Sequence, residues 1–309
     1  MKSIIFLTGG LGNQLFQTAN ALKNANGEFK NVSFETKAGQ PRVNKFGQPE
    51  VYDYISFEPI ESNLKTNKLL RKIYRLNLSL STRKMNGAML VFKKIITIIS
   101  SIFVSLFNCK IIFIFSGNGI GFNNDRKSNA NRFNKLYIGY FQSYLFSDEA
   151  QVKSLYKIQK TSQVSQVFTI SEKLKVSDKV VVHVRRGDYL QEEDFGVLGI
   201  EYYSQAITYF TNLGFQQFLV FSDEPETAKV LFARFKGIKI QFFEELDLSS
   251  SQILEIMSHG AGFIIANSTF SWWAGYLKKD SLATVVAPNK WFAHKIDPNM
   301  LLPSEWVRI

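Results

Sequence analysis

Short apolar runs alternate with amphipathic segments throughout the second half of the chain, and this alternation limits the fold more than any other feature. The runs are rich in Val, Ile and Phe, and we expect strands at 179–184, 217–221, 238–243, 262–266 and 283–287. The segments between them have helical apolar spacing, and we expect helices at 200–213, 226–235, 249–258 and 271–277. Parallel strands need such crossovers, so the pattern predicts a doubly wound α/β domain with a parallel sheet.

The first half of the chain is less regular. It opens with a strand, a glycine-rich loop and a helix within 3–25, followed by a weak strand at 32–34. The stretch 37–84 is polar and basic and contains three prolines, so we expect loops or a helical insert there. A length of 309 residues is enough for two domains, and we place the boundary near residue 150, giving domains 1–150 and 151–309.

Residues 95–115 are apolar enough to raise the question of a membrane-spanning helix. Asn108 and Lys110 fall inside this segment, and its pattern changes from helical spacing to a short continuous run at 111–115. We therefore favour a buried helix followed by a strand, and expect no spanning segment. The alternative is a helix that touches an anionic membrane surface, because many basic residues precede it: Lys65, Lys68, Arg71, Lys72, Arg75, Arg83 and Lys84.

The chain carries a net charge of +11, which favours anionic partners such as a nucleotide, a nucleic acid or an acidic membrane surface. No arginine-rich arm or RNA-binding motif is present, so we expect no nucleic-acid partner. The single cysteine, Cys109, excludes an internal disulfide, and the three histidines lie far apart. The apolar run near the N-terminus is too short for a signal peptide, so we expect a cytoplasmic protein.

The motif His183–Tyr189 directly follows a predicted buried strand. In an open α/β sheet, ligands bind at the carboxyl ends of the strands. The adjacent Arg185 and Arg186 indicate an anion there, because the planar guanidinium matches phosphate oxygens bidentately. His183 and Asp188 on either side suggest a larger ligand, such as a nucleotide. The alternative is a solvated basic turn in which one arginine pairs with Asp188.

The glycine-rich loop Gly9–Gln17 is a second candidate for a ligand-binding segment. It lacks the third glycine of a dinucleotide fingerprint, because Leu15 occupies that position, and no Gly-Lys-Ser/Thr follows it. It does offer N–H groups at a helix start, beside the amides of Asn13 and Gln14. The alternative is a plain turn between a strand and a helix.

Two further strand ends carry polar groups. The carboxylate of Asp223, next to Ser222, can accept hydrogen bonds from a purine or a ribose hydroxyl. Either residue can also cap the helix that begins near Pro225, and both roles can hold at once. The segment 267–275 offers hydroxyls at a helix start, where anions bind, and we favour core packing for its two tryptophans. Together with the arginines, these strand ends indicate a nucleotide-diphosphate site.

No Asp-x-Asp pair occurs in the chain. Glycosyl transfer that uses a divalent cation usually shows such a pair for the diphosphate. If the ligand is a nucleotide sugar, the arginines must neutralise the leaving diphosphate, and we expect neither a metal nor another cofactor.

The joint pattern resembles the bacterial α-1,2-fucosyltransferases of glycosyltransferase family 11. Five motifs occur in the family order, at 9–17, 139–143, 183–189, 222–224 and 267–274. The resemblance implies a GT-B architecture, with two Rossmann-like domains facing across a cleft. It also implies GDP-fucose as the donor, inversion at the anomeric carbon and no metal requirement.

The resemblance also implies residue roles. Arg185 would bind the diphosphate and stabilise the leaving GDP, supported by Arg186, while His183 and Asp223 would contact the guanosine. Asn13 would face the reacting sugar, and it more plausibly positions a hydroxyl than acts as a base. The remaining expected contacts are Gly10, Gly12, Gln14, Tyr189, Ser222, Asn267 and Ser271, with Ser268 and Thr269 holding phosphate. Asp188 is a candidate base, although the two arginines beside it would lower its pKa.

The resulting hypothesis is transfer of L-fucose from GDP-fucose to the 2-hydroxyl of a terminal galactoside. The acceptor would be a galactose-containing glycan, with a lipid-linked glycan as one option, and the enzyme would be soluble or peripheral on the inner face of the cytoplasmic membrane. Two alternatives stay open. One is a transferase for another deoxysugar, and the other is a non-catalytic module that binds nucleotides or a membrane surface.

Overall fold

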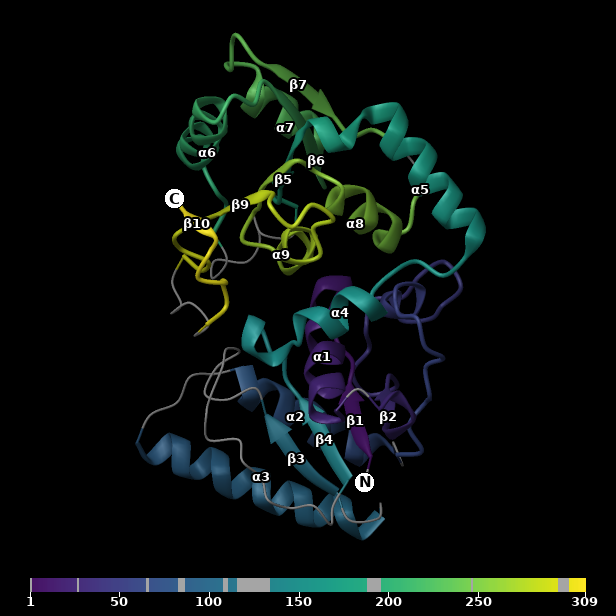
Figure 1. Ribbon diagram of the computed structural model, residues 1–309. Helices are drawn as coiled ribbons and strands as arrows, with labels where there is room; N and C mark the ends of the chain where they lie inside the picture. Colours follow the sequence, from purple (N-terminus) through teal and green to yellow (C-terminus); the bar gives the residue numbers. More distant parts are fainter. Residues whose placement is uncertain are drawn as a thin grey trace. The chain divides into compact units, whose positions relative to one another are not determined.

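The computed structural model describes residues 2–26, 28–64, 67–82, 87–107, 111–115, 134–187, 196–245, 247–293 and 300–309. The chain folds into two compact units, each built on its own parallel sheet (Figure 1). The first unit comprises Met1–Lys157 and Pro298–Leu301, and the second comprises Ile158–Asp297 and Leu302–Ile309. The α/β fold class predicted from the sequence, with two parallel sheets, is confirmed.

The first unit contains a four-stranded sheet with the order β2-β1-β4-β3. Its strands are β1 (Ser3–Phe6), β2 (Val32–Glu35), β3 (Ile111–Phe115) and β4 (Asn134–Ile138), and its helices are α1 (Leu11–Asn24), α2 (Lys68–Thr82), α3 (Ala88–Phe107) and α4 (Glu149–Leu155). Ile4 and Phe6 of β1 point to the face where Tyr74 of α2 and Val104 of α3 complete one core cluster. Helix α1 contacts β1 and contributes nothing to that cluster, so it covers the opposite face.

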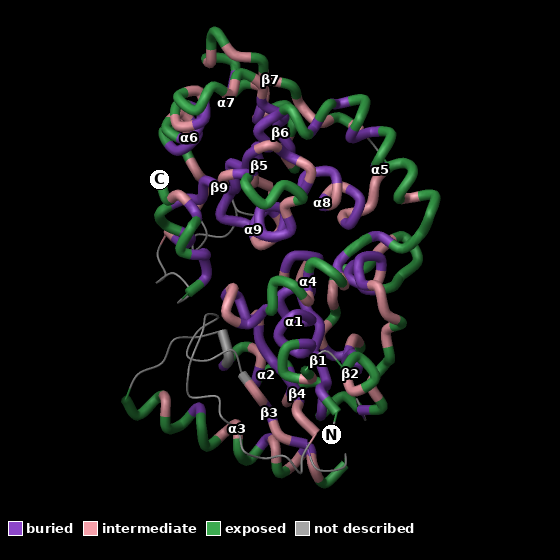
Figure 2. The backbone as a smooth tube through the Cα atoms, viewed as in Figure 1, coloured by how far each residue is buried: buried purple, intermediate pink, exposed green. Residues whose placement is uncertain are grey.

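Helix α3 departs from the sequence-based prediction. The strand expected at 111–115 is present as β3, but the helix before it is not buried. Its buried residues are Lys93, Ser100 and Val104, and the rest of α3 is exposed or intermediate (Figure 2), including nine large apolar residues that are exposed. The isoleucine spacing defined an apolar face correctly, but such a pattern cannot say whether protein covers that face. By length and composition, α3 is also the one described helix that could cross a membrane.

The second unit contains a six-stranded parallel sheet with the order β10-β9-β8-β5-β6-β7. Its strands are β5 (Val180–Val184), β6 (Gln217–Ser222), β7 (Lys239–Phe242), β8 (Gly262–Ile264), β9 (Thr284–Ala287) and β10 (Val307–Arg308). The first five match the predicted alternation closely. Strand β10 was not predicted, because two residues after Pro303 are too short to show a period.

Helices cover both faces of this second sheet. They are α5 (Thr161–Leu174), α6 (Ile200–Asn212), α7 (Pro225–Phe232), α8 (Ser250–Ser258) and α9 (Thr269–Tyr276). Val180, Val182 and Val184 of β5 share a core cluster with α6 and α7. The alternation along β5 therefore turns His183 to the other face, where its ring contacts Phe270 of α9. Single 3-10 turns lie at Phe29–Asn31, Glu50–Asp53, Tyr144–Phe146 and Val176–Asp178.

The strand order reverses next to β5. From β5 the chain proceeds through β6 to β7 on one side, and then returns to β8, β9 and β10 on the other side. Such a reversal is a topological switch point, where the loops after neighbouring strands leave the sheet in opposite directions and make room for a ligand. The loops after β5, β6 and β8 are therefore the ones placed to form a site.

Candidate active site

Three of the predicted motifs begin at the same edge of the second sheet. Val184, at the end of β5, pairs with Ser222 of β6, and Val182 pairs with Ile264 at the end of β8. The strands are parallel, so the segments that follow them leave the sheet at its carboxyl edge. These segments hold the two arginines, the carboxylates after β6 and the hydroxyls before α9.

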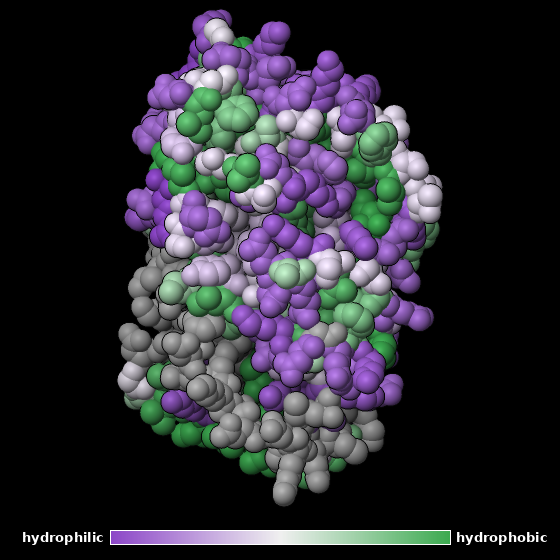
Figure 3. Space-filling model, in the orientation of Figure 1, coloured by the Kyte–Doolittle hydropathy of each residue, from purple (hydrophilic) through white to green (hydrophobic). Residues whose placement is uncertain are grey.

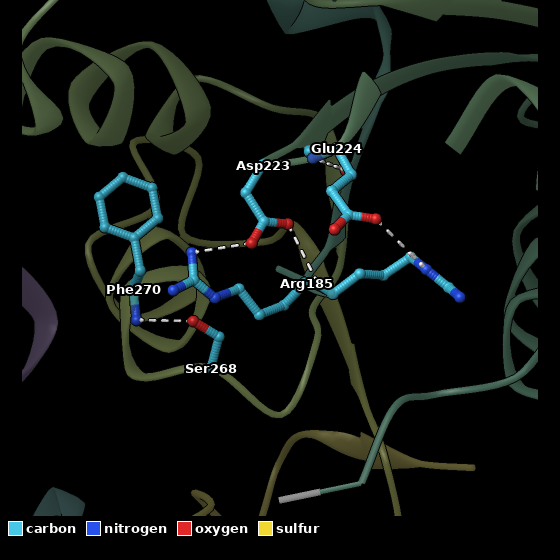
Figure 4. Close-up of polar contacts among 7 residues, drawn as sticks. Arg185, Asp223, Glu224, Ser268 and Phe270 are labelled. Atoms are coloured by element: carbon cyan, nitrogen blue, oxygen red, sulfur yellow. Dashed lines mark hydrogen bonds and ion pairs between the residues drawn. The ribbon is translucent and has the colours of Figure 1, made fainter. Parts of the chain in front are cut away.

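Asp223 links the loop after β5 to the loop after β6. Its Oδ2 lies 3.2 Å from Nη1 of Arg185, and its Oδ1 accepts a hydrogen bond of 3.0 Å from the backbone N–H of Arg186. In Figure 4 the side chain of Arg185 extends toward Asp223 and toward the start of α9, where Ser268 lies. Asp223 therefore orients one arginine through its charge and fixes the backbone of the next.

Glu224 faces the second arginine. Its Oε2 lies 3.9 Å from Nε of Arg186, and both side chains are partly exposed. The carboxylates that face the two arginines thus come from the neighbouring strand end. Asp188, the partner considered in the alternative interpretation, lies outside the described residues, as does Tyr189.

Gly187 allows Asp223 to approach the loop after β5. A Cβ atom at this position would lie 2.6 Å from Oδ2 of Asp223, closer than real Cβ contacts. A side chain here would push the carboxylate away from Arg185. Ser222 serves the adjacent turn, because its hydroxyl accepts a hydrogen bond of 3.0 Å from the N–H of Glu224.

His183 is enclosed within the second unit, with 6% of its surface exposed. Its carbonyl oxygen accepts a hydrogen bond from the hydroxyl of Tyr203, and its Nδ1 is buried without a hydrogen-bond partner in the described part of the chain. Burial lowers the pKa of His183 to about 3, and the positive charge of Arg185 adds to this effect. The imidazole is therefore neutral at physiological pH.

This lowered pKa predicts acid-sensitive stability. Below the ordinary value of 6.5, the unfolded chain protonates this histidine while the folded chain resists protonation down to about pH 3. His183 should therefore destabilise the fold by about 1.4 kcal/mol per pH unit between those values, and should contribute no pH dependence above them. Urea unfolding of the wild type and His183→Gln across this range tests the prediction, and a stability difference that does not change with pH would refute it.

The polar side chains around the start of α9 fall into two groups, those hydrogen-bonded within the protein and one that is available to a ligand. The amide of Asn267 donates to the carbonyls of Gly196 and Trp291, at 3.1 and 3.0 Å, and so ties distant loops together. The hydroxyl of Ser268 caps α9 by accepting from the N–H of Phe270, and that of Ser271 donates back to backbone carbonyls. The hydroxyl of Thr269 has no partner among the described residues and is half-buried, so it is the group here best placed to meet a phosphate.

The tryptophans Trp272 and Trp273 are fully buried and contact each other at a centroid distance of 4.9 Å. The predicted core packing of this pair is confirmed. Their packing holds the first turn of α9 against the second unit.

The glycine-rich loop of the first unit differs from the expectation of free N–H groups at its helix start. The N–H of Leu11, the first residue of α1, donates to Oε2 of Glu50 at 2.7 Å, so the protein's own carboxylate occupies this position. Gly10 precedes the helix as its N-cap, and Gly12 is buried within its first turn. A carboxylate at a helix N-terminus is favourable, which explains why Glu50 takes the place of an external anion.

Gln14 is likewise occupied within the first unit. Its Nε2 donates to the carbonyls of Gly9 and Arg42, both at 2.9 Å, and its Oε1 accepts from the N–H of Val51. Both amide hydrogens are therefore used to hold the loop. This side chain is a structural tie in the described structure.

Asn13 is the first-unit candidate that keeps an available donor. Its Oδ1 accepts a hydrogen bond of 3.0 Å from Nε2 of Gln142, while its Nδ2 has no partner in the described structure. Gln142 is 6% exposed, and its Oε1 is buried without a described hydrogen-bond partner. Phe141 adopts a left-handed φ of 54°, which turns the chain at this point. Gln142 thus fixes the orientation of Asn13.

A family model described as glycosyl transferase family 11 matches residues 120–309, more than half of the chain. The chain belongs to glycosyl transferase family 11. The match includes all three segments at the carboxyl edge of the second sheet, and it therefore contains Arg185, Asp223 and Thr269.

Two curated relatives of this family 11 chain come from Escherichia coli. An α-1,2-colitosyltransferase is 33% identical over 157 residues, which cover 45% of this chain and 50% of the relative. The O-antigen biosynthesis glycosyltransferase WbnK is 35% identical over 133 residues, which cover 41% of this chain and 43% of the relative. The chain therefore matches half or less of the length of these relatives.

Among solved structures, fucosyltransferase NodZ from Bradyrhizobium matches the family 11 chain with a TM-score of 0.50 at 11% identity. The match covers 89% of this chain and 93% of NodZ. At this identity the likeness concerns the fold, and it supports the GT-B class expected from the sequence.

Sequence reasoning missed three residues that contact the predicted motifs, two in the first unit and one in the second. Glu50 and Gln142 contact the N-terminal loop, and Glu224 faces Arg186. Gln142 and Glu224 lay inside recognised motifs but had no assigned role, whereas Glu50 lies in a stretch without a motif. A single sequence gives no local signal for contacts across 39 or 129 positions.

Proposed function

We propose that the protein transfers L-fucose from GDP-fucose to the 2-hydroxyl of a terminal galactoside, with inversion. The observation that carries this proposal is the pair of Arg185 and Asp223 at the switch point of the second sheet, in a family 11 chain. Family membership supports glycosyl transfer, and an α-1,2 linkage is named in one relative. Because the chain matches half or less of the length of these relatives, the activity of the whole protein is part of this proposal.

The proposed chemistry needs positive charge at the donor diphosphate. The galactoside 2-hydroxyl oxygen forms a bond to the anomeric carbon while the bond from that carbon to the phosphate oxygen breaks. The hydroxyl proton passes to a base, and negative charge grows on the departing GDP. Arg185 would stabilise that charge, and Thr269 with the first N–H groups of α9 would bind phosphate oxygens. Asn13, held by Gln142, would position a sugar hydroxyl.

A second candidate is transfer of colitose, because the relative that is 33% identical is named for that sugar. Colitose is fucose without its 3-hydroxyl. A site that hydrogen-bonds this hydroxyl rejects the deoxy sugar strongly, whereas a site with only apolar contacts there discriminates weakly. The choice between the two donors is therefore a matter of one hydroxyl.

Parallel assays with GDP-fucose and GDP-colitose, each with a β-galactoside, test the proposal. We expect faster GDP release with GDP-fucose, and release that depends on the acceptor. Preference for GDP-colitose would favour the second candidate. Nucleotide binding without turnover on either donor would indicate a non-catalytic module.

Turnover should also survive excess EDTA. The chain has no Asp-x-Asp pair, and the described residues include no group of three or more His, Cys, Asp or Glu side chains arranged to hold a metal. The arginines after β5 would supply the charge that a cation supplies in metal-dependent transferases. The measurement is initial rate with and without EDTA, and a loss of rate restored by Mn²⁺ or Mg²⁺ would contradict this prediction.

A further inference from the structure

Helix α3 is amphipathic in the reverse of the usual sense. The face of α3 that packs on the first unit is partly polar: Lys93 and Ser100 are buried there beside Val104, and the hydroxyl of Ser105 bonds to the backbone of Ile111 in β3. Nine of its large apolar residues are exposed, between 40% and 75%: Met89, Val91, Phe92, Ile95, Ile98, Ile99, Ile102, Leu106 and Phe107. Figure 3 shows hydrophobic side chains at the lower edge of the view, where α3 lies in Figure 1.

An exposed apolar surface of this extent needs a partner. Soluble monomers rarely expose contiguous apolar patches of this kind outside interaction sites. A row of nine large apolar side chains along one helix is therefore a surface that something apolar covers.

The sequence around α3 is strongly basic, and this charge indicates what kind of partner covers the helix. Residues 62–124 contain ten Lys and Arg and no Asp or Glu, so they supply +10 of the net charge of +11. Helix α2, which contacts α3, exposes Lys68, Arg71, Lys72 and Arg75, and α3 itself exposes Lys94. Basic residues beside an exposed apolar helix face match a surface that is anionic outside and apolar beneath.

We propose that α3 lies in the interface of an anionic phospholipid membrane, with its apolar face in the lipid and the basic residues of α2 at the headgroups. A second copy of the chain fits less well, because two surfaces of this charge repel each other. A spanning orientation is disfavoured because the inner face of α3 packs on β3 and carries the buried ammonium group of Lys93, which has no hydrogen-bond partner in the described structure.

Depth-resolved fluorescence tests the proposal without any sugar substrate, so it is independent of the proposed activity. The native tryptophans, Trp272, Trp273, Trp291 and Trp306, are all buried in the second unit and give a constant background. A Phe92→Trp variant is mixed with vesicles of equimolar phosphatidylcholine and phosphatidylglycerol that carry brominated acyl chains. We expect quenching and a blue shift of the new tryptophan.

The matched control is Phe168→Trp on α5, because Phe168 is 64% exposed and Phe92 is 61% exposed. We expect no quenching of this tryptophan. Equal quenching at both positions, or vesicle binding without quenching at position 92, would overturn the proposal. Equal binding to vesicles of phosphatidylcholine alone would remove the role of charge and also contradict it.

A triple variant separates lipid contact from self-association. Replacing Ile95, Ile99 and Ile102 with glutamine keeps the charge and should weaken vesicle binding by more than about tenfold. The control replaces Val230 and Leu282, exposed apolar residues of the second unit, with glutamine and should bind like the wild type. Light scattering that shows a wild-type dimer, lost in the triple variant, would assign the face to a second copy and refute the membrane proposal.

Discussion

Replacement of Arg185 with alanine should lower kcat/KM for the glycosyl donor by about 10²–10³, or ~2.7–4 kcal/mol of transition-state stabilisation, as for removal of one donor aimed at a developing anion. The guanidinium is held by Asp223 at the carboxyl edge of the second sheet, so its orientation is set before substrate binds. Arg185→Lys should also be poor, because an ammonium group is a point charge and cannot reproduce the planar fork.

Steady-state kinetics with GDP-fucose and a β-galactoside provide the measurement. Arg234→Ala is the matched control, because it removes one exposed arginine from the same unit without touching the site. We expect this control to stay within a few-fold of the wild type. Activity of Arg185→Lys within a few-fold of the wild type would remove Arg185 from the mechanism.

Replacement of Asp223 with asparagine should lower the rate by about 10- to 100-fold, because hydrogen bonds to charged groups contribute ~1.5–3 kcal/mol. The asparagine keeps the size of the side chain but loses the charge that faces Arg185 and one of the two carboxylate oxygens. If Asp223 acts by positioning Arg185, the loss should fall mainly on kcat.

The double variant Arg185→Ala/Asp223→Asn separates positioning from guanosine recognition. A positioning role predicts that Asp223→Asn has little further effect once Arg185 is gone, because the two act as one unit. Direct contact with the guanosine predicts instead that the donor KM rises equally in both backgrounds. The latter result would support the role implied by family resemblance and would argue against the positioning role.

The sequence predicted the second unit well because its strands are short, apolar and separated by helices of clear period. Val180–Val184 and Gln217–Ser222 carry this signal locally. Helix α3 shows the limit of the same reasoning, because its period revealed an apolar face but not whether protein covers it. Burial depends on what the rest of the chain places against a helix, and a single helix pattern does not contain that information.

The functional motifs also separate into residues that the sequence identified and contacts that only the fold reveals. Arg185 and Asp223 were each recognised at the end of a strand, and the parallel pairing of β5 with β6 explains why they meet. The contact of Glu50 with the start of α1 could not be predicted, because it joins a motif to a stretch without one. Residues with a local motif were found, whereas those that act through a long-range contact required the fold.

The linkage of the product is the decisive test of the proposed α-1,2-fucosyl transfer. The protein is incubated with GDP-fucose and a β-galactoside, and the purified product is analysed by two-dimensional NMR. We expect a new α-fucosyl residue, with a downfield shift at carbon 2 of the galactose and a through-space contact between the fucose anomeric proton and that position. Fucose attached to another hydroxyl, a β-anomer, or no fucose transfer with turnover of a different nucleotide sugar would contradict it.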